Sequence, residues 1–67
     1  MYIVIELQKS AEGHVFNLVT EHASLAEAES KYHTILAAAA VSNLPCHSAV
    51  LVSEEGFPVM HQCYKCS

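Results

Sequence analysis

The sequence predicts a single α+β domain over residues 1–67, in which a four-stranded antiparallel sheet in ββαββ order carries one helix packed on one face. Two alternating, β-rich runs precede the one long stretch of helix-forming residues, and two more follow it. Turn residues separate the runs of each pair. The 67-residue chain is too short for a second core, and its 52% apolar and 15% charged content is typical of a folded protein.

The first two strands are expected over residues 2–8 and 14–21. In the first run Ile3, Ile5 and Leu7 alternate with Val4 and its neighbours, and β-branched residues dominate. The five residues between the runs include a glycine that can adopt positive φ. This spacing predicts a β-hairpin.

A helix is expected from about residue 25 to residue 42. Ser24 and Glu27 form a capping box, in which the hydroxyl accepts from a backbone N–H of the first turn. Pro45 prevents continuation, and Asn43 suits the C-terminal cap. At 100° per residue one apolar stripe is expected to face the core, namely Leu25, Ala28, Tyr32, Ile35, Leu36 and Ala39.

The second pair of strands is expected over residues 47–53 and 57–64, joined by a turn at 54–56. Val50 and Val52 oppose Ala49 and Leu51 in the first of these runs. Pro58 has no N–H to donate, so its strand is expected to lie at a sheet edge or to have an unpaired end.

Apolar side chains on both faces of at least three strands predict a homo-oligomer. One helix covers one face, and the other face of a water-exposed antiparallel sheet is normally polar. The outer helix face carries small side chains, which either allow close approach of a partner helix or simply reflect the helix propensity of alanine. Oligomerisation also suits a chain of this size, whose own core contributes little stability.

The charge distribution argues against nucleic acid or an anionic membrane surface as a partner. The net charge is −4, with three lysines and no arginine. The start of the chain has no basic segment before its apolar residues, and the longest apolar run is far shorter than a membrane span. We therefore expect a soluble, cytoplasmic protein. Three cysteines, an odd number, suit a reducing compartment better than a disulfide framework.

No catalytic residues, cofactor or metal ligands are expected. Five histidines are scattered, and none lies beside a nucleophile with an orienting carboxylate. Cys63 and Cys66 form a C-x-x-C pair at the very end of the chain, where no helix can follow to activate a thiol. A zinc site that adds His61, Cys46 or His47 is the less favoured alternative, because the spacing matches no standard pattern.

The densest polar run of the expected helix is the candidate ligand site. Ser30, Lys31, His33 and Thr34 supply hydroxyls, an imidazole and one ammonium, while Tyr2 and Tyr64 can stack on a base. We expect them to line a cleft between subunits. The alternative is a solvated helix face with one surface ion pair from Glu27 to Lys31.

Three segments, MYIVIELQ, AESKYHTILAAAAVSNLP and VLVSEEGFP, together resemble a group of short proteins encoded by bacteriophages and prophages of gut Firmicutes. This resemblance transfers no functional residues. It favours a small non-enzymatic oligomer that sequesters a nucleotide-derived immune signal, of the cyclic nucleotide or cyclic ADP-ribose type, against anti-phage defence. The alternative is a protein-interaction module, either an inhibitor of a host protein or a minor structural component.

Overall fold

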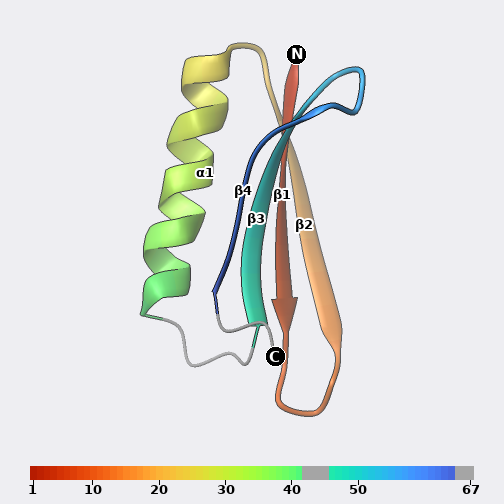
Figure 1. Ribbon diagram of the computed structural model, residues 1–67, viewed down its shortest axis with the longest axis vertical. Helices are drawn as coiled ribbons and strands as arrows, with labels where there is room; N and C mark the ends of the chain where they lie inside the picture. The colour runs from red at the N-terminus through yellow and green to blue at the C-terminus, as the bar shows by residue number, and fades with distance from the viewer. Residues whose placement is uncertain (42–45, 65–67) are drawn as a thin grey trace.

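The computed structural model describes residues 1–41 and 46–64, and it confirms the expected α+β fold (Figure 1). One helix lies against one side of a single open sheet. The elements are β1 (Tyr2–Lys9), β2 (Val15–His22), α1 (Leu25–Ala40), β3 (Cys46–Ser53) and β4 (Pro58–Tyr64).

The sheet has the order β2-β1-β3-β4, with every neighbouring pair antiparallel. The central strands β1 and β3 belong to different hairpins. Their pairing, in which Val4 lies opposite Leu51 and Ile5 opposite Val50, therefore joins the two halves of the chain. β4 is an edge strand that begins at Pro58, as expected of a residue without an N–H.

The ends of α1 follow local chemistry. The N–H of Glu27 donates to Oγ of Ser24 over 3.2 Å, which confirms the predicted N-terminal cap. The helix ends at Ala40 with Val41 as its C-cap, two residues before the expected end. The predicted cap Asn43 lies outside the described residues. Within the described chain, α1 is not long and apolar enough to cross a membrane.

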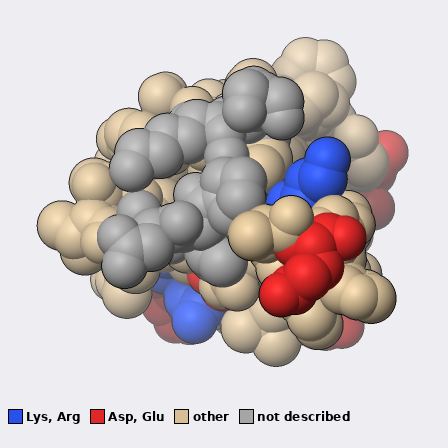
Figure 2. Space-filling view, turned by 90° about the horizontal axis from the view of Figure 1, so that it is seen from below, with Lys and Arg blue, Asp and Glu red and all other residues tan. Residues whose placement is uncertain are grey.

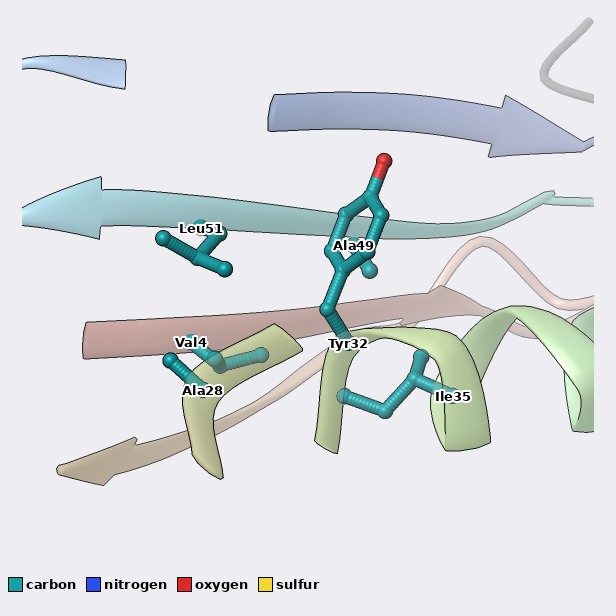
Figure 3. Close-up of a cluster of buried hydrophobic side chains, with 6 residues drawn as sticks. All are labelled: Val4, Ala28, Tyr32, Ile35, Ala49 and Leu51. Carbon is teal, nitrogen blue, oxygen red and sulfur yellow. The ribbon is translucent and has the colours of Figure 1, made fainter. Parts of the chain in front are cut away.

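The core lies between α1 and the two central strands, where Tyr32 reaches from the helix over Ala49 (Figure 3). Its buried side chains are Val4, Ala28, Tyr32, Ile35, Ala49 and Leu51. Ala39 is also buried, and Leu36 packs against the cluster, as the helical stripe predicts. The stripe is wrong for Leu25, the first residue of the helix, which is 38% exposed.

Both hairpin turns use a glycine at positive φ, Gly13 at 91° and Gly56 at 86°. In the second turn the Gly56 N–H donates to the Ser53 carbonyl oxygen over 2.8 Å. The Ser53 hydroxyl accepts from the Phe57 N–H over 3.2 Å. These bonds satisfy turn backbone groups that the β3–β4 ladder leaves unpaired.

The same substitution at two valines tests the position of the core. Val4 is fully buried, whereas Val41 is 83% exposed. Val4→Ala should lower the free energy of unfolding by about 2 kcal/mol, through lost burial and a residual cavity, and Val41→Ala by less than about 0.5 kcal/mol. Urea unfolding of both variants measures this, and equal losses would contradict the assigned core.

Candidate functional site

The polar run predicted as a ligand site lies along the helix surface. Ser30, His33 and Thr34 are exposed, while Lys31 is half-buried. The Thr34 hydroxyl donates to the Ser30 carbonyl oxygen over 2.9 Å, so its proton is already engaged by the helix backbone. The His33 ring stands edge-on to Tyr32, with ring centroids 5.4 Å apart.

The two tyrosines of the predicted site lie at opposite ends of the sheet. Tyr2 pairs with Ser53 on β3, whereas Tyr64 pairs with His47 at the other end of that strand. Six residues of strand separate these positions, which corresponds to roughly 20 Å. A single chain therefore does not gather the six predicted residues into one site, and a cleft between subunits stays a prediction.

Tyr64 does lie near the helix. Burial raises the pKa of Tyr32, and the charge of an ionised Tyr64 raises it further. The two phenols thus lie close enough to influence each other on the side of the sheet that α1 covers.

The structure brings together a buried polar pair that the sequence analysis missed. Glu6 and His47 project from neighbouring central strands toward the helix side, and His47 Nε2 lies 2.7 Å from Glu6 Oε2. Gln8 Nε2 donates to the same carboxylate oxygen over 2.8 Å. Only 5% of the His47 side chain and 15% of the Glu6 side chain are exposed. Strand alternation was the available signal. It places Glu6, two residues after Val4, on the core-facing side of the first strand.

The pKa of Glu6 is the result of opposing effects. Burial alone raises it, but hydrogen bonds from His47 and Gln8, with the charges of His47 and Lys31, outweigh burial. The pKa of Glu6 therefore lies below its ordinary value of 4.5. The carboxylate stays ionised at neutral pH and holds the neighbouring side chains in place.

The hydrogen bond within the pair fixes the proton on one ring nitrogen of His47. An ionised carboxylate accepts, so Nε2 of His47 carries the proton between them. Nδ1, the other ring nitrogen, is buried and has no hydrogen-bond partner within residues 1–41 and 46–64. A general base must reach the proton that it removes, and neither ring nitrogen of His47 is available to a substrate.

A shallow groove runs beside the pair. It has a volume of about 180 Å³ and is lined by Glu6, Gln8, Phe16, Asn17 and Leu18. Small-molecule pockets usually hold about 300–1,000 Å³, so the groove is small for a nucleotide. The Glu6 carboxylate in its wall also repels phosphate.

A second surface is the side of the sheet opposite α1, here called the open face. Strand register defines it in four rows across the sheet. The rows are Glu21, Ile3 and Val52; Val19, Ile5, Val50 and His61; Asn17, Leu7, Ser48 and Cys63; and Val15, Lys9 and Cys46.

The two middle rows of the open face combine four apolar side chains with polar ones. Ile5, Leu7, Val19 and Val50 are the apolar members, and Asn17, Ser48 and His61 are the polar members. Val19, on the edge strand β2, is 54% exposed on this face. The predicted two-sided apolar pattern is thus confirmed in the strands. On the end of the molecule seen in Figure 2, both basic and acidic side chains lie among uncharged atoms.

The cysteines depart from the expectation of reduced thiols. Cys46 is disulfide-bonded, and Cys63 is a half-buried free thiol. Cys66, part of the alternative zinc site, lies outside the described residues. Within the ranges 1–41 and 46–64, no group of three His, Cys, Asp or Glu side chains is placed to hold a metal ion.

No protein-family model matches the chain, and neither does any curated protein or solved structure compared with it. The resemblance to short phage proteins accordingly stays a prediction. Function must be argued from the surface itself.

The lowered pKa of Glu6 gives the pair a pH signature. A folded-state pKa below 4.5 stabilises the fold above that value, and the contribution disappears as the pH falls through the folded pKa. Glu6→Gln should lower the free energy of unfolding at pH 7 by about 1–3 kcal/mol and flatten its decline below about pH 4.5.

Urea unfolding between neutral and acidic pH checks this. Glu12→Gln, in the exposed first turn, is the matched control and should leave the pH profile unchanged. A Glu6→Gln profile parallel to that of the parent chain would contradict a stabilising role for the pair.

Proposed function

We propose that this chain is a small non-enzymatic binding protein that acts through protein association on its open face. The observation that carries the proposal is a set of adjoining apolar side chains on the side of the sheet opposite α1. They are half-buried within a single chain, namely Ile3, Ile5, Leu7, Val50 and Val52. A contiguous exposed apolar surface usually marks an interaction site. In a 67-residue chain, burying that surface against a partner also supplies stability that a small core lacks.

The chemistry near the helix supports a binding role rather than catalysis. His47 is almost fully buried, Glu6 is hydrogen-bonded to it at the edge of the groove, and the groove is small. The apolar side chains of the open face offer extended area, and its two middle rows contain no carboxylate or ammonium. These features suit recognition of a protein surface of matching shape.

Two adjacent residues of β2 provide a matched test. Val19 lies on the open face and Leu18 on the opposite side, with exposed fractions of 54% and 52%. Val19→Lys should weaken capture of partners from bacterial lysate, including an untagged copy of the chain, by at least about tenfold, because a charge enters an apolar interface. Leu18→Lys should not.

Both variants should have the same urea midpoint of unfolding as the parent chain, because both positions are exposed. If capture depends on Leu18 and not on Val19, the binding surface lies on the helix side. Capture that neither substitution affects would refute the proposal.

Sequestration of a nucleotide-derived immune signal is the second proposed function, and Lys31 is the observation in its favour. Lys31 is half-buried, and its charge acts on Glu6, which lines the groove. An ammonium and hydroxyls are groups that bind a single phosphodiester. The carboxylate of Glu6 and the separation of Tyr2 from Tyr64 weigh against it in a single chain.

Thermal shift against cyclic dinucleotides and cyclic ADP-ribose isomers tests this function. A bound ligand raises the Tm of the parent chain in proportion to its saturation, whereas Lys31→Ala should abolish the shift. No shift with any ligand at high micromolar concentration would reject the nucleotide proposal and leave protein association unaffected.

A further inference from the structure

The open face carries two opposite charges at opposite ends. Lys9 lies in the row of Val15 and Cys46, and Glu21 lies in the row of Ile3 and Val52. Among the described strand residues, no other Lys or Glu side chain lies on this face. Six residues of strand, roughly 20 Å, separate the two rows, so the charges cannot pair within one chain.

The area of the face is sufficient for a second copy. Four strands about 4.8 Å apart and about eight residues long at 3.4 Å each project roughly 500 Å². Two copies would bury about 1,000 Å² of projected area, and more accessible area because side chains interdigitate. That meets the lower bound for a specific interface.

From these observations, and resting on the proposed association through the open face, we infer that the occupant of this face is a second copy of the chain. The two sheets pack face to face about a two-fold axis. This axis lies in the plane midway between the sheets and crosses the strands at right angles. This operation reverses strand direction, so the Lys9 row of each copy lies over the Ile3 row of its partner. Sheets of this kind pack about 10 Å apart with nearly aligned strands.

The charges select this axis over the alternative. The axis that crosses the strands brings Lys9 of each copy near Glu21 of the partner subunit. Glu21 is then one strand away from the position directly opposite Lys9, and the two long side chains span that gap. A two-fold axis parallel to the strands would instead place the Lys9 ends together and the Glu21 ends together. Like charges across an interface disfavour that arrangement.

Charge substitutions at the two positions test the geometry. Lys9→Glu and Glu21→Lys should each weaken dimerisation about tenfold, because each places like charges in both symmetry-related pairs. The double variant K9E/E21K should restore the parent affinity to within about threefold. An equimolar mixture of the two single variants should also dimerise with near-parent affinity, since both of its pairs are then opposite in sign.

Glu21→Lys is the discriminating variant. It makes the net charge of −4 less negative, so general repulsion between copies would predict tighter dimerisation, whereas the proposed geometry predicts weaker. Sedimentation equilibrium of the purified full chain measures each affinity, and urea unfolding confirms that each variant is folded. Both positions are exposed, so neither change disturbs the core.

The outcomes separate this inference from the proposed function. A monomeric parent chain whose lysate capture is still lost on Val19→Lys would overturn the self-association and leave protein binding through the open face intact. A dimeric parent that Glu21→Lys leaves unchanged or tightens would overturn the assigned two-fold axis. Weakening by both single variants with recovery in the double variant is the supporting result.

Discussion

The coverage of only one sheet face by one helix is the constraint on which the rest of this structure depends. α1 packs chiefly against the central strands β3 and β1, and the buried cluster around Val4 and Leu51 forms there. The opposite face of the same strands is equally apolar but has no second layer among the described residues. An apolar sheet face is normally buried against another layer of secondary structure. The open face has the apolar content of such a buried face.

This asymmetry also explains where polar groups occur. On the covered side, Glu6, Gln8 and His47 form hydrogen bonds with one another, so that a carboxylate can lie beside the core without an isolated buried charge. On the open face, the centre has no carboxylate or ammonium and the two charged side chains lie in the end rows. A buried hydrogen-bonded pair and exposed charges in the end rows contribute differently, because solvent screens exposed charges far more than buried ones.

The functional proposals follow from the same division. The groove beside the Glu6–His47 pair is small, whereas the apolar rows of the open face offer more area for recognition. The helix surface with Ser30, Lys31 and Thr34 remains the place to seek a small anionic ligand. If two chains meet at the open face, that helix surface stays exposed on the outside of the pair, opposite the sheet-to-sheet contact.

Local patterns in the sequence were sufficient for most of the fold. Period-two alternation predicts all four strands, and the Ser24–Glu27 cap predicts the helix start, because these signals depend on neighbours in the chain. The helix end was placed two residues late. Leu25 satisfies the helical period, but whether the sheet extends beneath it depends on strand length and packing, which local pattern does not encode.

The sequence by itself thus determined the elements, their order and the surplus of apolar side chains on both strand faces. Only the tertiary structure decided that β1 pairs with β3, and with this register it joined Glu6 to His47, 41 positions away along the chain. It also separated Tyr2 from Tyr64 and placed Lys9 and Glu21 at opposite ends of one face. The physical reason is that alternation specifies which face a side chain occupies, whereas strand order and register specify which side chains share it.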